Sequence, residues 1–318
     1  MISGDDGTEL GVFPLAAIQV SSRLGNLPRR FTLPSGALFE CDDNDAAERL
    51  FEQHGFARRS GFLHRLERSW RLALGAVVFT AIAGIAFILY GIPATANYLA
   101  QRTPSSVEQF LGQETLRTLD GAFFEPTQLS DGEHEQAQTL FARVARGRTR
   151  GEDGYHLLLR ASPLIGPNAL ALPDGTIILT DELWELREHN EEIIAVLAHE
   201  AAHIDRRHGL QAVYQAALVP AAIALVTGDP TQIAQMAAIL PGILVQSAYS
   251  RDLEQEADDD AVIFLNRIGI SPSRLADLLE RLDRELCGEA QCAPGWIGTH
   301  PQTVTRAARL REGQGESR

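Results

Sequence analysis

Lysine is absent from the sequence: all 28 basic residues among the 318 are arginine. A lysine amine is required for Schiff-base catalysis, for a Ser–Lys catalytic dyad and for the Walker A loop that holds nucleotide phosphates. The sequence therefore excludes these three chemistries. We expect no nucleotide partner, and we exclude an ATP-driven protease.

Cysteine is scarce, and acidic residues outnumber basic ones. Three cysteines are too few for a disulfide-built scaffold or for a four-cysteine zinc site. The net charge of −14 argues against nucleic acid as a partner, because phosphate binding needs clustered cations. With 45% hydrophobic and 22% charged residues, the composition is that of a globular protein of one or two domains, and it argues against extensive disorder or many membrane spans.

One hydrophobic run departs from this average composition. Leu72–Ile92 contains 21 residues without a charge, and as a helix it would be about 31 Å long, enough to cross a bilayer. Trp70 and Tyr90 stand at its two edges, as aromatic residues do at membrane interfaces, which favours a membrane span over a buried core helix. About seventy residues precede the run, which is too many for a cleavable signal peptide.

The charges on either side of this run predict its orientation. No basic residue follows it as far as Ala100, whereas five arginines precede it: Arg58, Arg59, Arg65, Arg68 and Arg71. The positive-inside rule therefore predicts a single-pass inner-membrane protein with a cytoplasmic N-terminus and a periplasmic or extracytoplasmic C-terminal part. Cys41 then lies on the reducing side. Cys287 and Cys292 lie on the oxidising side, either as a disulfide that closes a small loop or as two unrelated thiols.

These features divide the chain into five parts. Residues 1–60 alternate short apolar runs with Gly, Pro and Ser, and they predict a small β-rich cytosolic domain with a hairpin turn at 34–36 and a short helix capped by Asp43 or Asn44. The other parts are a basic segment at 61–71, the membrane helix at 72–92, a large domain at 93–311 and a disordered tail at 312–318. In the large domain we expect helices at 106–119 and 132–146, strands at 155–161, 169–172 and 176–180, and a helical remainder.

The chemistry concentrates in the segment LAHEAAHIDRRHG at residues 197–209. His199 and His203 are four residues apart, so on a helix they share one face and can bind the same cation. Glu200, one step around the helix, can take a proton from water at that cation. This is the H-E-x-x-H arrangement of zinc peptidases.

The residues around this motif argue for one buried helix. We expect about five turns, from an N-cap at Asn190 to a stop at Gly209. The alternative, an exposed polar face, is disfavoured because the neighbouring residues of the motif are apolar. Two buried histidines and a buried glutamate without a partner would be costly.

A catalytic zinc needs a third protein ligand and an open coordination position. The histidine of the extended metzincin motif is missing, and His208 is poorly placed because it lies about 140° around the helix from His203. The next acidic helix, at 250–265, offers Glu254 as the ligand and Asp258, four residues on, as a hydrogen-bond acceptor for a ligand histidine. The remaining acids of this helix are expected on a solvated face: Glu256, Asp259 and Asp260.

On these motifs the chain resembles the membrane-associated zinc metallopeptidases typified by HtpX, BepA, the mitochondrial Oma-type proteases and the CAAX prenyl protease. The resemblance covers about residues 100–311 and is carried by four segments: GPNALALPDGTIILTDEL, NEEIIAVLAHEAAHIDRRHG, YSRDLEQEAD and THPQTVTR. It implies an α+β fold, in which a mostly helical gluzincin metalloprotease domain contains a small β-sheet whose edge strand receives the substrate backbone.

The resemblance also implies a role for each matching residue. The implied ligands of one Zn²⁺ per chain are His199, His203 and Glu254. The implied catalytic residues are Glu200 as general base, Asp258 as the acid behind a ligand, and His300 and Arg306 on a loop over the active site. His300 is then a gate that fills the fourth metal position, an oxyanion donor, or a surface histidine before a proline. Ala202 departs from the glycine that is usual in the family.

We therefore expect a membrane-anchored zinc metalloendopeptidase that acts in quality control of misfolded envelope or membrane proteins. Its partners are polypeptide substrates and the lipid bilayer, while the oligomeric state stays open. The alternative is a non-catalytic zinc-stabilised chaperone or scaffold, but a purely structural site has no use for the base Glu200. Two apolar stretches lie between the ligand helices, at 210–226 and 233–245, and each is shorter than a span needs. We expect buried or membrane-touching helices there, with core packing favoured over a re-entrant hairpin.

Overall fold

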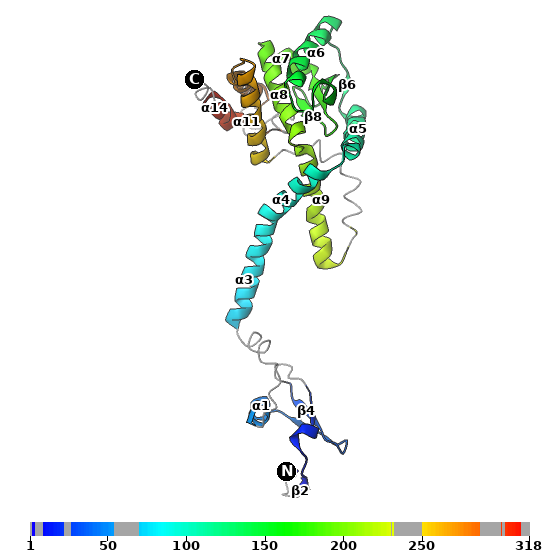
Figure 1. The fold of residues 1–318 in the computed structure, drawn as a ribbon, viewed down its shortest axis with the longest axis vertical. Coiled ribbons are helices and arrows are strands. Elements are labelled where there is room, and N and C mark those ends of the chain that lie inside the picture. Colours follow the sequence, from blue (N-terminus) through cyan, green and yellow to red (C-terminus); the bar gives the residue numbers. More distant parts are fainter. Residues whose placement is uncertain are drawn as a thin grey trace. The chain divides into compact units, whose positions relative to one another are not determined.

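The computed structural model of the chain describes residues 2–3, 9–21, 27–53, 70–229, 231, 250–286, 300 and 303–312 (Figure 1). The described chain is mostly helical with small β-sheets, which agrees with the expected α+β class. It forms two compact units, Met1–Ile82 and Ala83–Arg318, and each is considered by itself below. The cysteines at 287 and 292, the tail from 313 and the basic segment as far as residue 69 lie outside the described residues.

The first unit contains short antiparallel strands and one amphipathic helix. Its strands are β1 (Ile2–Ser3), β2 (Glu9–Gly11), β3 (Gln19–Val20), β4 (Arg29–Thr32) and β5 (Leu38–Cys41), and its helix is α1 (Asn44–Gln53). The expected hairpin turn is confirmed between β4 and β5, where Gly36 adopts a φ of +84°, a conformation that favours glycine. The Asp43 carboxylate accepts a hydrogen bond from the Ala46 amide at 2.8 Å and so caps α1.

The expected hydrophobic run is helical, and the helix continues past it. Helix α3 (Trp70–Ala86), a π-helical turn η2 (Phe87–Gly91) and α4 (Ile92–Arg102) follow one another without a break. Two helices of the described chain are long and apolar enough to cross a bilayer: Leu72–Arg102, with a mean hydropathy of 2.6, and His208–Thr227, with 1.6.

The second unit places a four-stranded sheet among helices. Its elements after α4 are α5 (Ser105–Ala122), β6 (Glu125–Pro126), α6 (Asp131–Arg146), η3 (Glu152–Gly154), β7 (His156–Ala161), β8 (Ala169–Ala171), β9 (Thr176–Thr180), α7 (Asp181–Leu186), α8 (Asn190–Asp205), α9 (His208–Thr227), α11 (Arg251–Arg267), α12 (Ser273–Leu286) and α14 (Thr303–Glu312). The helices and strands expected between residues 106 and 180 all appear within three residues of their predicted bounds.

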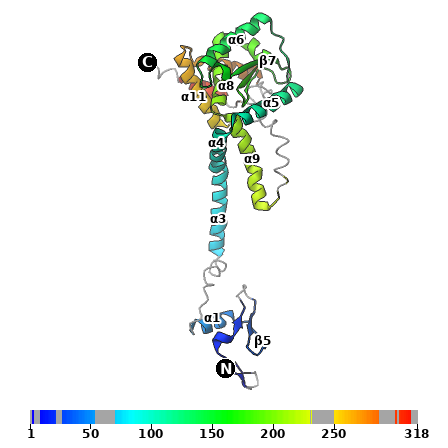
Figure 2. The same ribbon diagram turned by 45° about the vertical axis from the view of Figure 1, so that its right-hand side comes forward.

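Both faces of this sheet are covered. The strand order is β6-β7-β9-β8, with β7 and β9 parallel and the other pairs antiparallel, so β8 forms one edge. Along β9, Ile177 and Leu179 join the core formed with α6, α8, α11 and α12, whereas Ile178 packs with Leu119 of α5 on the opposite face. Figure 2 shows α6, α8 and α5 gathered around these strands. Helix α8 thereby lies in the centre of the unit.

Candidate metal centre

Helix α8 carries the H-E-x-x-H residues in a fully buried position. Every residue from Ile193 to Ile204 is buried, because apolar side chains on the rest of the helix pack against the sheet and against α11 and α12. His199 and Glu200 are 0% exposed, and His203 is 1% exposed. The polar face of the helix is therefore enclosed by protein, as the sequence predicts.

Four side chains from three separate parts of the chain converge on this face. One donor atom of each lies within 4.8 Å of the others: His199, His203, Glu254 and His300. His199 Nε2 and His203 Nε2 are 3.0 Å apart, and His300 Nδ1 lies 2.9 Å from Glu254 Oε1. Glu254 comes from the first turn of α11, whose start is capped by the Ser250 hydroxyl. Imidazole nitrogens and a carboxylate oxygen are the ligands that zinc takes in proteins, so this donor set fits a metal ion.

A second layer of charge holds these donors. His199 Nδ1 lies 3.0 Å from Asp258 Oδ1, and Asp258 accepts two hydrogen bonds of 2.8 Å from Arg306 on α14. The same guanidinium reaches Glu254 Oε2 at 2.6 Å. Arg306 thus compensates both carboxylates that α11 buries, and this explains how two acids remain ionised in the interior.

The pKa values follow from burial set against these contacts. Burial opposes ionisation of Asp258, but the hydrogen bonds from Arg306 outweigh it and lower its pKa to about 2. Burial also opposes protonation of His199, yet its contacts with Asp258 and Glu254 raise the pKa to about 9 in the metal-free chain. Burial dominates for the other two groups of α8: it lowers the pKa of His203 and raises the pKa of Glu200.

The carboxylate of Glu200 has no hydrogen-bond donor among the residues that the structure describes. His300 Nε2 lies 3.5 Å from its Oε1 atom. A buried carboxylate in this condition is costly unless a further group, such as water or a substrate, supplies the missing hydrogen bond. Glu200 is therefore positioned to accept a hydrogen bond from a water molecule or a substrate that enters the site.

The structure corrects the expectation of a single helix from Asn190 to Gly209. Helix α8 ends at Asp205, and its N-cap is His189 rather than Asn190. Arg207 adopts a φ of 58°, which breaks the helix, and α9 starts at His208. Two contacts of its guanidinium hold Arg207 in place: Glu108 Oε1 at 2.9 Å and the Ala100 carbonyl at 2.8 Å.

This break places His208 where the helix geometry did not predict it. Its Nδ1 atom lies 2.9 Å from Nδ1 of His203, the ring nitrogen that points away from the converging donors. The sequence does not predict this supporting position for His208. The turn at Arg207 brings His208 to this position, and the sequence does not reveal it, because a left-handed arginine has no sequence signature.

The outer acids of α11 lie at the surface and pair with arginines. Arg206 contacts Glu256 at 3.0 Å and Asp260 at 2.6 Å, so it ties the end of α8 to α11. Arg309 of α14 contacts Asp259 at 3.1 Å. These pairs agree with the expected outer face and add links between the helices that carry the donors.

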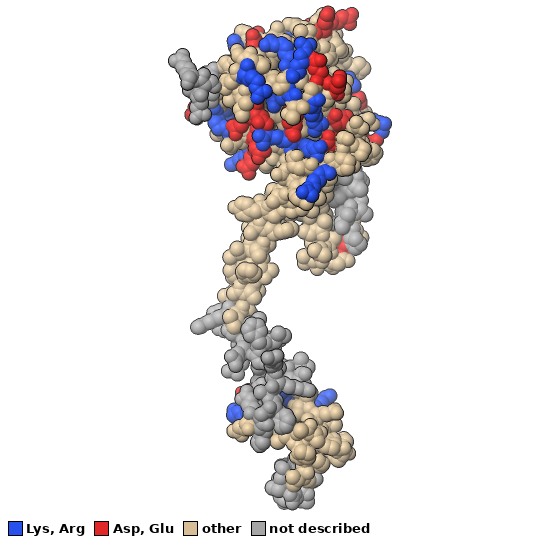
Figure 3. Space-filling view, viewed as in Figure 1, with Lys and Arg blue, Asp and Glu red and all other residues tan. Residues whose placement is uncertain are grey.

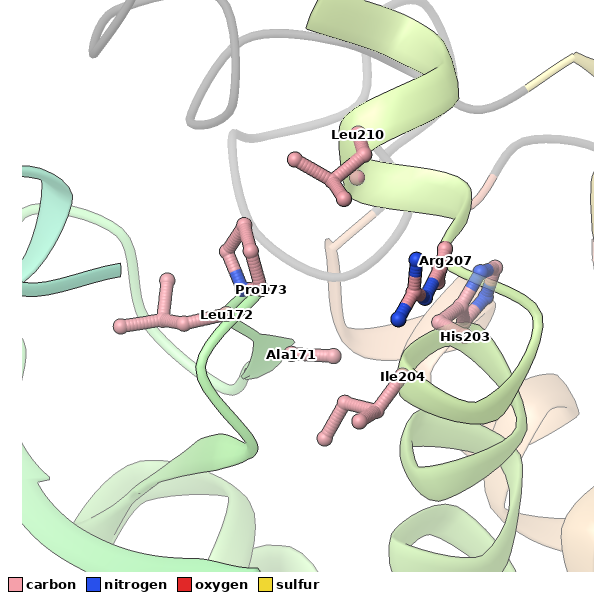
Figure 4. Close-up of a pocket in the computed structure, with 8 residues that line it drawn as sticks. Ala171, Leu172, Pro173, His203, Ile204, Arg207 and Leu210 are labelled. Carbon is pink, nitrogen blue, oxygen red and sulfur yellow. The ribbon is translucent and has the colours of Figure 1, made fainter. Parts of the chain in front are cut away.

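A small pocket lies between the sheet edge and α8 (Figure 4). Its walls come from the end of β8, from the last turn of α8 and from the start of α9: Ala171, Leu172, Pro173, His203, Ile204, Arg207, Gly209 and Leu210. His203 belongs both to this pocket and to the converging donors, so the pocket borders the candidate metal centre on the side of the edge strand.

Comparison with known proteins assigns this unit to a family. The profile described as Peptidase family M48 matches residues 132–314, more than half of the chain. The chain belongs to peptidase family M48. This confirms the resemblance predicted from the sequence motifs, and all seven candidate site residues fall inside the matched M48 segment. A second profile, Domain of unknown function (DUF7092), matches residues 1–54.

Curated relatives of this M48 chain carry protease names. It is 26% identical to mitochondrial metalloendopeptidase OMA1 of Schizosaccharomyces pombe over 46% of the chain and 43% of that protein. It is 31% identical to metalloprotease YcaL of Escherichia coli over 54% of the chain and 67% of YcaL. The beta-barrel assembly-enhancing protease of Yersinia pestis is 29% identical over 54% of the chain and 37% of that protein. The chain thus spans less than half the length of the first and third of these relatives.

Proposed function

We propose that this M48 chain is a membrane-anchored zinc metalloendopeptidase. The observation that carries the proposal is the convergence of buried imidazole and carboxylate donors beside the unpaired carboxylate of Glu200. His199, His203 and Glu254 would hold one zinc ion per chain. Asp258 would fix the orientation of His199, since carboxylates behind ligand histidines do so in zinc sites.

The proposed reaction is the hydrolysis of a peptide bond. Zinc supplies the Lewis acidity that polarises the carbonyl and acidifies water. Glu200 accepts the proton of the attacking water at a carboxylate oxygen and then delivers it to the amine of the leaving chain. Its raised pKa suits both steps, because a base with a very low pKa would not pass the proton on.

His300 and Arg306 complete the proposal. His300 approaches Glu254 and Glu200 in a fully buried position, so we assign it as a fourth donor that closes the site until a substrate displaces it. Arg306 holds Glu254 and Asp258 and stays near enough to the donors to stabilise negative charge that develops during attack.

We further propose where the parts of the chain lie. Residues 72–92 cross the inner membrane. The β-rich domain at 1–60 and the basic segment at 61–71 lie in the cytoplasm. The peptidase domain at 93–311 lies on the other side of the membrane and ends in a disordered tail at 312–318. The substrates are polypeptides of the envelope or membrane, since the relatives include an assembly-enhancing protease and a mitochondrial metalloendopeptidase. The substrate backbone would bind along β8.

Two substitutions test the assigned roles. Glu200→Gln should abolish cleavage of casein and self-cleavage while retaining about one zinc per chain, because this side chain moves a proton and does not bind the metal. Glu254→Ala should lose both activity and zinc. The measurements are proteolysis of the purified full chain with and without a chelator, and metal content by mass spectrometry. Loss of zinc from Glu200→Gln, or proteolysis that survives this substitution, would contradict the roles; a wild-type chain that binds zinc but cleaves nothing would favour a scaffold.

A further inference from the structure

Two groups of exposed large apolar side chains lie near α4 and α9 in the unit Ala83–Arg318. The group before α4 consists of Ile85, Phe87, Ile88, Leu89 and Tyr90. The group in the last part of α9 consists of Val219, Ile223, Leu225 and Val226. Leu225 and Val226 are each 87% exposed. Figure 3 shows charged side chains gathered over the body of this unit, while α4 and α9 project from it as largely uncharged surfaces. From Gly209 to Gly228 the sequence contains no charged residue.

Helices α4 and α9 pack side by side and run in opposite directions. The start of α9 is fixed to the end of α4: Arg207 donates hydrogen bonds to the carbonyls of Ala100 and Thr103 at 2.8 and 3.0 Å, and the Tyr214 and Thr103 hydroxyls are 2.8 Å apart. Small or aliphatic side chains of α4 are buried along this pair: Ile92, Ala96 and Ala100. Both ribbon views show α9 leaving the body on the side of α4 (Figures 1 and 2).

The helix lengths determine how far α9 extends past the start of α4. Helix α4 has 11 residues and α9 has 20. When the start of α9 is aligned with the end of α4, where the two are bonded, the last nine residues of α9, Val219–Thr227, extend beyond Ile92. Nine helical residues measure about 14 Å, roughly half of a hydrocarbon core of about 30 Å. Ile92 is the last residue of the proposed membrane span, and the strongly exposed apolar residues of α9 all lie within these nine.

We propose that Val219–Thr227 inserts into the hydrocarbon of the bilayer leaflet nearer the peptidase unit, beside the proposed anchor helix. The segment is too short to cross, so α9 forms a second membrane contact that does not add a span. Because only two residues separate α9 from the helix that carries His199 and His203, this contact fixes the candidate metal centre close to the membrane surface. The inference rests on the proposed anchor and is independent of the proposed catalytic roles.

Lipid photocrosslinking from matched leucines tests this insertion. The full chain carries the benzophenone amino acid benzoylphenylalanine at Leu225 or, as the control, at Leu164, which is also strongly exposed, at 71%. Leu164 lies two residues after Ser162, whose hydroxyl donates a hydrogen bond to the Phe123 carbonyl. Phe123 lies at the end of α5 that is remote from α4, so this control is placed away from the proposed membrane contact. Each variant is reconstituted in vesicles of phosphatidylethanolamine and phosphatidylglycerol with alkyne-tagged acyl chains, floated on a density gradient and irradiated.

We expect a tagged-lipid adduct at least tenfold more abundant for Leu225 than for Leu164, and the same result with the probe at Val226. The melting temperature of each variant in detergent, compared with that of the wild-type chain, verifies that the unit is folded. Co-flotation without a lipid adduct at Leu225, or an adduct to a second copy of the chain in its place, would overturn the insertion while leaving the anchor intact. A chain that fails to float would contradict the anchor and the insertion together.

Discussion

At the scale of single residues, the candidate metal centre depends on charges that compensate one another in the absence of bulk water. Glu254 and Asp258 are both nearly inaccessible, at 2% and 1% exposure, and both are contacted by Arg306. A lysine would bring only one ammonium to this position, whereas the planar guanidinium reaches two carboxylates at once. The exclusive use of arginine in this chain is therefore compatible with a densely charged interior.

His208 supports a first prediction at this scale. Because its Nδ1 lies 2.9 Å from His203 Nδ1, it orients the imidazole whose other nitrogen faces the proposed zinc ion. His208→Ala should lower zinc affinity about 10–100-fold, as removal of partners behind metal ligands does. His208→Asn, which keeps a hydrogen-bonding atom near the Nδ1 position, should recover part of this loss. Competition with a chelator of known affinity measures the zinc affinity of both variants, and a chain with His134→Ala, at an exposed histidine, is the control. Unchanged zinc affinity in His208→Ala would mean that His208 does not support the site.

His300 supports the second prediction. If it closes the site as proposed, His300→Ala opens the fourth donor position and should raise basal casein cleavage or self-degradation severalfold over wild type. An oxyanion donor would give the opposite pattern, with lower activity in His300→Ala and partial retention in His300→Arg. Initial rates of both variants at saturating zinc distinguish the two roles. Equal activity in all three proteins would mean that His300 takes no part.

At the scale of elements, local signals predicted most of the helices and strands of the peptidase unit. Helix α6 starts at a capping box formed by Ser130 and Glu133, and β9 shows the apolar run of a strand buried on both faces. The break between α8 and α9 could not be predicted in this way. It depends on Arg207 in a left-handed conformation, fixed by Glu108 and by carbonyls of α4, which lie far away in the sequence. The contact of His208 with His203 could not be predicted for the same reason.

The attachment of α12 to α8 supports the third prediction. Glu192, in the first turn of α8, is fully buried and receives two hydrogen bonds of 2.9 and 3.0 Å from Arg281. Burial alone would raise the pKa of Glu192, but Arg281 and the Glu188 amide hold it below its ordinary value. Glu192→Gln should lower the free energy of unfolding by about 1–3 kcal/mol at pH 7.

The pH dependence of this loss follows from the sign of the pKa shift. A lowered pKa in the folded state means that ionised Glu192 contributes stability above the unfolded pKa of about 4.5, and that this contribution is lost as the pH falls through the folded pKa. The melting temperatures of wild type and Glu192→Gln, measured by scanning fluorimetry in detergent, should therefore differ at pH 7 and converge as the pH falls below 4.5 and through the folded pKa. The exposed neighbour Glu191→Gln should change neither; a gap that persists at acid pH would contradict the ionic contribution of Glu192.

At the scale of the whole molecule, the sequence predicted the apolar run but not where its helix ends. Leu72–Ile92 was recognisable from the absence of charge, whereas the continuation through α4 to Arg102 depends on packing against α9. The convergence of His199, His203 and Glu254 was likewise predictable, since the spacing of four residues between the two histidines and between Glu254 and Asp258 is a local feature of each helix. The position of α14, which brings Arg306 to both acids of α11, was suggested only by the family motif, because no local pattern indicates it.

Membrane orientation supports the last prediction. Five arginines lie within residues 58–71 and none lies between residue 72 and Arg102, and this bias should hold the N-terminus in the cytoplasm. Alkaline phosphatase, which is active only outside the cytoplasm, should therefore be active when fused after residue 120 and inactive when fused near residue 60. A fluorescent protein that matures only in the cytoplasm should give the reverse pattern at the same two positions. Replacing the five arginines by glutamine should reduce phosphatase activity at residue 120, because the orienting charge is then lost. An active phosphatase at residue 60 would invert the topology, and the peptidase unit would then face the cytoplasm with Cys287 and Cys292 in a reducing compartment.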